Sequence, residues 1–124
     1  MSKITKFEDI EAWKRSRELN KLIYKVSNKS NFSKDWGLRD QIRRSSVSVM
    51  SNIAEGFDSD SMIEFARYLA ISRRSASEVQ SQLYVALDQS YINKEEFANL
   101  YNENEEIKRM ITGFIKYLRN PRRS

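Results

Sequence analysis

The stretch FANLYNENEEIKRMITGFIKYL, residues 97–118, decides the fold class of this chain. Its apolar positions and one asparagine recur at alternating intervals of three and four residues, the spacing of one face of an α-helix. Helices that pack side by side with a left-handed crossing sustain such a seam over many turns. We therefore predict a long amphipathic helix over residues 94–118. Its seam consists of Phe97, Leu100, Asn104, Ile107, Ile111, Phe114 and Leu118.

Three further segments repeat this period and are predicted to be helices: residues 8–27, 38–55 and 62–88. Only short polar stretches separate them. The chain has three glycines and one proline, which leaves few of the turns that a β-sandwich or barrel needs. We predict an all-α chain that folds as one domain, residues 1–124, into an up-and-down antiparallel four-helix bundle. An extended assembly of helical hairpins is the alternative.

Two glycines and one capping pattern refine this prediction. Gly56 follows a helical pattern and is expected to end that helix with a positive φ. Gly113 interrupts a good helix and is expected to mark a close helix crossing. Asn93 and Glu96 have the spacing of a capping box, which predicts a helix start between them.

The composition excludes several classes of function. Without cysteine the chain forms no disulfide, and without histidine it lacks the commonest general base and zinc ligand. The longest apolar run, residues 83–87, is far shorter than the ~20 residues that cross a bilayer. Glu103 and Glu106 have helical spacing, but metal sites in bundles pair such carboxylates with histidine. We expect a cytoplasmic protein with no membrane partner, no metal, no cofactor and no catalytic residues.

Five polar residues in the two central helices suggest a hydrogen-bonded network. Asn52 and Glu55 lie near the end of one predicted helix, and Arg43 lies earlier on the same helix. Glu78 and Gln82 are one turn apart on the next helix. Networks of this kind fix helix register when every member is paired. We interpret the five as a structural polar network, and a functional pocket is the alternative.

The basic residues suggest a nucleic-acid contact. The net charge is +5, and residues 1–34 hold nine lysines and arginines against four acidic residues. Residues 94–124 hold seven against five, so an antiparallel bundle would bring two basic helices together. Such a surface can follow a phosphate backbone, and an ordinary solvated face is the alternative. The candidate nucleic-acid-binding residues are Lys14, Arg15, Lys21, Lys25, Arg119, Arg122 and Arg123.

The role of five aromatic side chains has two possible interpretations. They can supply an apolar interface between copies of the chain, or they can pack within it. These residues are Tyr24, Trp36, Tyr68, Tyr84 and Tyr91.

Several blocks of the chain resemble one bacterial family. The blocks are FEDIEAW (7–13), QIRRSSVS (41–48), SNIAEGF (51–57), EFARYL (64–69) and GFIKYL (113–118). Together they resemble the four-helix bundle proteins that are encoded in intervening sequences of large-subunit ribosomal RNA genes. They are also similar to the accessory proteins of diversity-generating retroelements.

The resemblance implies an oligomer that the composition does not reveal. It implies a homopentamer, with RNA or DNA and a reverse transcriptase as partners of the retroelement relatives. This chain has Met50 where the family often has proline, and Arg73 and Arg74 where it often has Leu-Gly. We therefore expect a non-enzymatic oligomeric accessory protein that binds nucleic acid through a basic surface. The alternative is an oligomeric protein-interaction scaffold with no nucleic-acid role.

Overall fold

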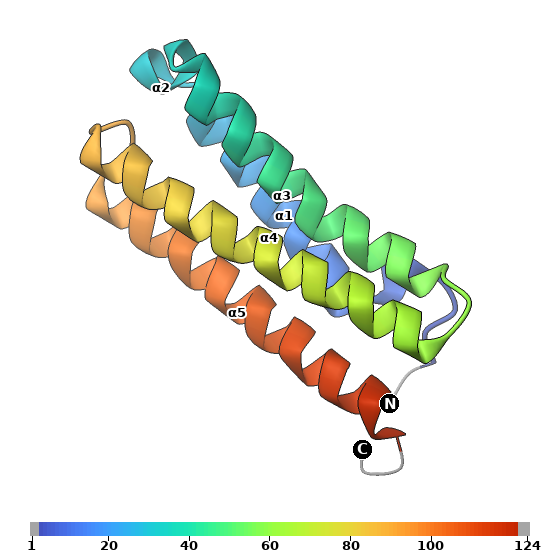
Figure 1. Ribbon diagram of the computed structural model, residues 1–124. Coiled ribbons are helices and arrows are strands. Elements are labelled where there is room, and N and C mark those ends of the chain that lie inside the picture. Colours follow the sequence, from blue (N-terminus) through green and yellow to red (C-terminus); the bar gives the residue numbers. More distant parts are fainter. Residues whose placement is uncertain (1–2, 122–124) are drawn as a thin grey trace.

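Residues 3–121 are described by a computed structural model, and over these residues the chain is helical and has no strand. The all-α fold class is confirmed, with five α-helices where four were predicted. Four of them are long and lie side by side (Figure 1). In chain order the elements are the 3-10 turn η1 (Phe7–Asp9), α1 (Glu11–Ser27), α2 (Ser30–Lys34), α3 (Trp36–Phe57), α4 (Met62–Asp88) and α5 (Lys94–Arg119).

The four long helices occupy the corners of the molecule in chain order. α1 packs against α3 and α5, and α4 packs against the same two helices. Each long helix runs opposite to the one before it, so α1 begins at the end of the molecule where α5 ends (Figure 1). Two neighbouring outer faces, one over α1 and α3 and one over α3 and α4, therefore share α3.

The short helix α2 forms where the sequence predicted only a turn. Phe32 is fully buried there and stacks on Tyr91, with 5.3 Å between the ring centroids. Asp35 caps the start of α3 by accepting a hydrogen bond of 3.1 Å from the backbone N–H of Leu38. The hydroxyl of Tyr91 donates to the other oxygen of Asp35 at 3.0 Å. These contacts tie the α4–α5 turn to the start of α3, which begins at residue 36 and not at 38.

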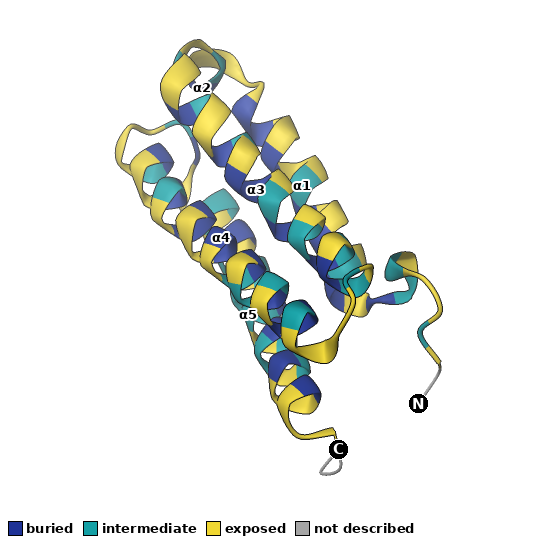
Figure 2. Cartoon of the chain, turned by 45° about the vertical axis from the view of Figure 1, so that its right-hand side comes forward, coloured by how far each residue is buried: buried dark blue, intermediate teal, exposed yellow. Residues whose placement is uncertain are grey.

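The core lies on the predicted inward stripes. Figure 2 shows buried residues on the sides of the helices that face one another and exposed residues on the outer sides. Full burial of each aliphatic side chain contributes about 1.5–3 kcal/mol. Among the most deeply buried of them are Leu19, Ile23, Ile42, Ile53, Leu69, Val79, Leu83, Ile107 and Ile111.

Both glycine predictions are corrected. Gly56 lies inside α3 and its φ is not positive. It is required for packing, since a Cβ there would lie 2.8 Å from Phe65 Cδ1 and from Tyr68 Cβ. Gly113 marks no close crossing, because a Cβ there would meet nothing within 4 Å.

The start of α5 follows the predicted capping box. The backbone N–H of Glu96 donates to Asn93 Oδ1 at 2.8 Å, and the N–H of Asn93 donates to Glu96 Oε1 at 2.9 Å. Two backbone donors that an α-helix leaves unpaired are satisfied in this way.

Candidate interaction surfaces

Small hydroxyl side chains hold α3 and α4 together. The Oγ atoms of Ser48 and Ser75 lie 2.7 Å apart, and Ser72 Oγ donates to the carbonyl of Val49 at 2.6 Å. Asn52 Nδ2 donates to the carbonyl and the hydroxyl of Ser48, at 2.9 and 3.0 Å. Of the five residues predicted to form a network, Asn52 alone joins this seam.

Arg43 makes its contacts on the other side of α3, with α1. Its Nε donates to Ser27 Oγ at 2.8 Å, and its Nη2 donates to the carbonyl of Tyr24 at 3.4 Å. Its Cζ lies 4.4 Å from the centroid of the Tyr24 ring, within the range of a cation–π interaction.

The remaining three predicted members lie on the outside. Glu55 and Glu78 are exposed, and neither has an ion pair within residues 3–121. Gln82 Oε1 is buried and has no hydrogen-bond partner among the described residues. With Glu78 and Val85, Gln82 lines a shallow hollow of about 600 Å³ between α3 and α4. The single predicted network is therefore replaced by two separate local contacts and an unpaired outer surface.

We call this outer surface the α3–α4 face and define it by Glu55, Ile71, Glu78, Gln82 and Val85. Helical spacing places the four α4 residues on one side, because residues 71, 78, 82 and 85 follow intervals of seven, four and three, and the exposed Arg74 shares that side. Ile71 is 37% exposed and Val85 is 45% exposed.

A polar group that the sequence did not reveal links α4 and α5. Gln80 is buried, and its Nε2 donates to Glu105 Oε1 at 2.9 Å. Lys108 Nζ donates to Gln80 Oε1 at 3.0 Å. The hydrogen bond from Gln80, with the nearby charge of Lys108, lowers the pKa of Glu105. In the sequence, the burial of Gln80 was indicated only by its position one turn after Ala76, on the inner stripe of the helix.

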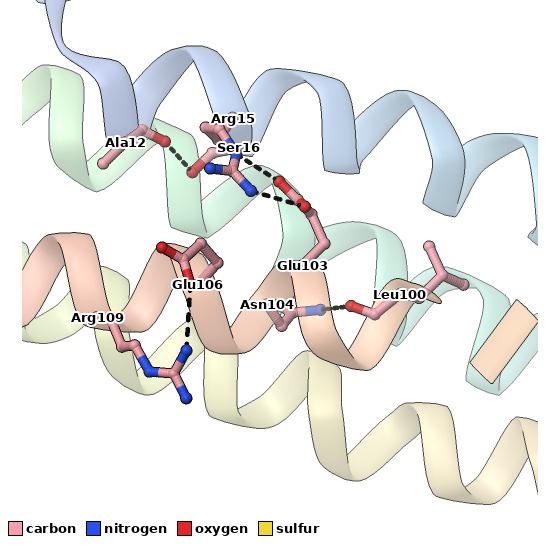
Figure 3. A network of polar contacts seen from close by, with 8 residues as sticks. All are labelled: Ala12, Arg15, Ser16, Leu100, Glu103, Asn104, Glu106 and Arg109. Carbon is pink, nitrogen blue, oxygen red and sulfur yellow. Dashed lines mark hydrogen bonds and ion pairs between the residues drawn. The ribbon is translucent and has the colours of Figure 1, made fainter. Parts of the chain in front are cut away.

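Three members of the predicted basic surface, Lys14, Arg15 and Lys21, are paired with neighbouring carboxylates. Arg15 donates from Nε and Nη2 to the two carboxylate oxygens of Glu103, at 2.7 and 2.9 Å (Figure 3). This hydrogen-bonded pair raises the pKa of Arg15. Lys14 pairs with an acidic residue one turn earlier on α1 at 3.7 Å, and Lys21 does so at 3.0 Å. Each of these three cations is therefore partly occupied within the chain.

The other described members lie at opposite ends of the molecule. Lys25 is in the last turn of α1, and Arg119 ends α5. Because the two helices are antiparallel, these residues are far apart. Both are exposed and have no ion pair within residues 3–121. Arg122 and Arg123 lie outside the described residues. The described residues that were predicted to bind nucleic acid therefore do not lie together at one end of the molecule.

A different basic surface lies over α1 and α3. We call it the arginine face and define it by Arg17, Tyr24, Arg43, Arg44 and Val47. On α1, residues 17 and 24 are seven apart and share a side, and on α3, residues 43, 44 and 47 share the adjoining side. None of the three arginines has a carboxylate partner in the part of the chain that the structure describes. The sequence reasoning did not assign Arg17 to any site, and it considered Arg44 only beside Arg43 in the polar network.

The arginine face surrounds a shallow hollow. Its volume is about 470 Å³, and Tyr24, Arg43, Arg44 and Val47 line it. Asp40 is the one acidic residue of the lining, and it pairs with a neighbouring arginine on α3 at 3.4 Å. The face therefore keeps a positive excess.

A further hollow, mostly apolar, lies where α1 begins and α5 ends. Its volume is about 810 Å³, and Ile10, Phe57, Phe65, Met110 and Phe114 are among the residues that line it. Within residues 3–121 no group of three or more carboxylates could hold a metal ion, and no helix is long and apolar enough to cross a membrane.

The comparison with known families bears on these surfaces. The family model described as the 23S rRNA-intervening sequence protein matches residues 8–113, which include α1, α3, α4 and most of α5. The chain belongs to the 23S rRNA-intervening sequence protein family. This agrees with the resemblance to proteins encoded in ribosomal RNA intervening sequences, while the similarity to retroelement accessory proteins stays a prediction.

A solved structure supports this family membership. It is a crystal structure of a protein of unknown function from the S23 ribosomal protein family of Bacteroides thetaiotaomicron. The two chains are 28% identical and superpose with a TM-score of 0.77, over 85% of this chain and 98% of that one. No curated protein matches the chain.

Proposed function

We propose that this member of the intervening sequence family is a non-enzymatic accessory protein that assembles with copies of itself. The observation that carries the proposal is the α3–α4 face. Glu55, Glu78 and Gln82 lack partners within the described chain there, beside the exposed side chains of Ile71 and Val85.

A partner on this face would stabilise the chain in two ways. A buried acceptor such as Gln82 Oε1 costs about 1–3 kcal/mol while it has no donor. Covering Ile71 and Val85 would remove apolar surface from water at about 25 cal/mol per Å². A second copy of this chain supplies both donors and apolar side chains.

Asp9, Glu96 and Glu105 do not have the raised pKa that a general base would need. A carboxyl group that acts as general base near neutral pH has a raised pKa. The shifts seen in Asp9, Glu96 and Glu105 are all downward, because each carboxylate accepts hydrogen bonds. We therefore place the function on the outer surfaces.

We further propose that the four long helices form an up-and-down antiparallel four-helix bundle, with α2 as an addition to the first connection. The assembly expected from the resemblance is a homopentamer. Sedimentation equilibrium over a wide range of concentrations tests self-assembly directly. A mass that stays at one chain, 14.7 kDa, at every concentration would refute it, and five times that mass would support the pentamer.

Nucleic-acid binding is a second candidate function, and Lys25 and Arg119 favour it because both are exposed and free of ion pairs in the described chain. The net charge of +5 multiplies on assembly and would attract a polyanion. A reverse transcriptase partner and a cytoplasmic location remain expectations from the sequence.

This second candidate can be tested with a labelled, structured RNA and fluorescence anisotropy across a salt series. Binding through phosphates weakens steeply as salt rises. The variant K25Q/R119Q should bind less tightly than K14Q/K21Q, which loses the same charge from ion-paired lysines. Undetectable binding at low salt, or binding that does not depend on salt, would exclude this candidate.

A further inference from the structure

We propose that the hollow between the start of α1 and the end of α5 binds a small aromatic molecule that carries an anionic group. We call it the aromatic hollow and define it by Phe57, Phe65, Gly113, Phe114 and Tyr117. The inference goes beyond the proposed accessory role and does not depend on self-assembly. It starts from four aromatic rings that line an open space of about 810 Å³.

The four aromatic side chains come from three helices and form a continuous wall. Phe57 ends α3, Phe65 lies in the first turn of α4, and Phe114 and Tyr117 lie near the end of α5. In this order the centroids of neighbouring rings are 6.1, 5.0 and 6.3 Å apart. Contact between aromatic rings is favourable beyond the burial of their area. The wall therefore favours an aromatic ligand over an aliphatic one.

The rings lie within a concave surface. Phe65 is 9% exposed, and Phe57 and Phe114 are partly buried against the core. Ile10 and Ala12, at the start of α1, also line the hollow and are almost fully buried. Sites for small molecules are concave, mostly apolar and roughly 300–1,000 Å³ in volume, a range that includes this hollow. A flat protein surface would not reach the buried rings, so the shape favours a small molecule.

A glycine inside α5 keeps this space open. Gly113 lines the hollow beside Phe114, and a Cβ at this position would meet nothing within 4 Å. Glycine in a helix interior costs about 1 kcal/mol relative to alanine. No contact within the described chain requires a glycine here. We therefore interpret Gly113 as the position that leaves room for the ligand.

Two methionines would let the hollow adjust to its ligand. Met62, at the start of α4, and Met110, on α5, both line it. The unbranched thioether side chain fills irregular spaces and makes favourable contacts with aromatic rings. Met62 is 54% exposed, so a ligand would also remove part of its apolar surface from water.

The charge at the edge of the hollow favours an anion. Among the described residues that line it, Lys3 and Glu11 are charged. Glu11 pairs with Lys14 at 3.7 Å, whereas Lys3 is exposed and has no ion pair within residues 3–121. In a mostly apolar site the few polar groups fix the orientation and specificity of the ligand. An aromatic body in the hollow, with one anionic group toward Lys3, matches both features.

Fluorescence titration of the full chain with anilinonaphthalene sulfonate, an aromatic monoanion, tests the inference. We expect saturable binding of one probe per chain. G113L should raise the dissociation constant at least ~10-fold, because the new side chain fills the space that the rings of the probe need. A98L places the same side chain at an exposed position of α5 outside the hollow, and it should bind the probe like the unmodified chain.

A neutral probe, phenylnaphthylamine, separates the aromatic part of the inference from the anionic part. K3Q should weaken binding of the sulfonate by about 2–5-fold, the effect of losing an exposed ion pair, and should leave binding of the neutral probe unchanged. K21Q removes a lysine outside the hollow and should change neither. Equal affinity of K3Q and the unmodified chain for the sulfonate would overturn the preference for an anion.

The aromatic site itself is overturned by either of two results. One is the absence of saturable binding, and the other is equal affinity of G113L and the unmodified chain. If the affinity for the probe falls as the protein concentration rises, a second copy of the chain occupies the hollow and the inference is again wrong. Near-UV circular dichroism and urea unfolding of each variant show whether the probe binds the native fold, because this class of probe also binds partly folded chains.

Discussion

Alanine substitutions at the two glycines inside helices should change stability in opposite directions. Gly56 and Gly113 both lie inside long helices, and neither has a positive φ. Alanine is favoured over glycine in a helix interior by about 1 kcal/mol, through backbone entropy. Gly113 lies six residues before the end of α5 and should show this gain in full, whereas Gly56 is the second-to-last residue of α3 and should show less of it.

The surroundings of the methyl group differ sharply. At Gly113 it enters open space, so G113A should raise the free energy of unfolding by about 1 kcal/mol. At Gly56 it would lie 2.8 Å from Tyr68 Cβ, an atom fixed by the backbone of α4, and equally close to Phe65 Cδ1. Overpacking of this kind costs about 1–3 kcal/mol, which offsets or exceeds the helix gain. We therefore expect G56A to be less stable than G113A by about 1–3 kcal/mol.

Urea unfolding followed by circular dichroism measures this difference. The midpoint should shift while the slope stays constant, as for a change in stability alone. For a chain of this size about 1 kcal/mol corresponds to roughly 4 °C in melting temperature. Each variant is compared at one fixed protein concentration, because self-association would add to apparent stability. Equal stabilisation of both variants, or a destabilised G113A, would refute the reasoning.

Three further predictions concern α5 and its contacts. N93A removes the cap of α5 and should lower the free energy of unfolding by about 1 kcal/mol in urea titrations, whereas A98S, within the helix, should change it little. I107A empties a fully buried position and should cost about 2–5 kcal/mol by the same assay, so a loss under 1 kcal/mol would contradict the packing. The pKa of Glu96 is lowered by the hydrogen bond from Asn93 and then by Lys29, so its contribution to stability is present above the ordinary glutamate pKa and is lost as the pH falls through the lowered value. Thermal melts from pH 7 to pH 3 should therefore show a weaker acid dependence in E96Q, and an unchanged profile would show that the carboxylate contributes nothing.

Exposure and packing separate the aromatic side chains that could contact another copy of the chain from those that pack within it. Trp36 is 70% exposed and so is available to a partner, whereas Tyr84, 50% exposed, packs its ring against Phe97 of α5 with 4.8 Å between the ring centroids. Tyr91 instead packs on Phe32 and holds the α4–α5 turn. The sequence left both roles open for each ring, and only the packing separates them.

Much of the fold was readable because it depends on local periodicity. The stripes that contain Ile107 and Ile111 predicted a long final helix, and Asn93 predicted its start to within a residue. Helix α2 was missed because a five-residue helix carries too few turns for a period. What stabilises it is the burial of Phe32 against Tyr91, a residue distant in the sequence.

The candidate sites were harder to predict from the sequence, because the burial and pairing of a side chain depend on residues that are distant in the chain. Glu78 and Gln80 are two residues apart on one helix, yet the first is exposed and the second is buried. Arg15 and Arg17 are likewise two residues apart, yet the first meets Glu103 on α5 and the second faces away from it. The side of a helix on which each neighbour packs decides such differences, and the sequence does not state which side that is.

The sequence by itself determined that the chain is helical, where most helices lie and which stripes face inward, because these depend on residues within a few turns. The tertiary structure alone decided which charges are neutralised, which polar atoms are left without partners and which outer faces adjoin. Those outcomes depend on the order in which the helices pack around the core. The paired lysines of α1, the nearby arginines without a carboxylate partner and the unsatisfied oxygen of Gln82 all follow from that order.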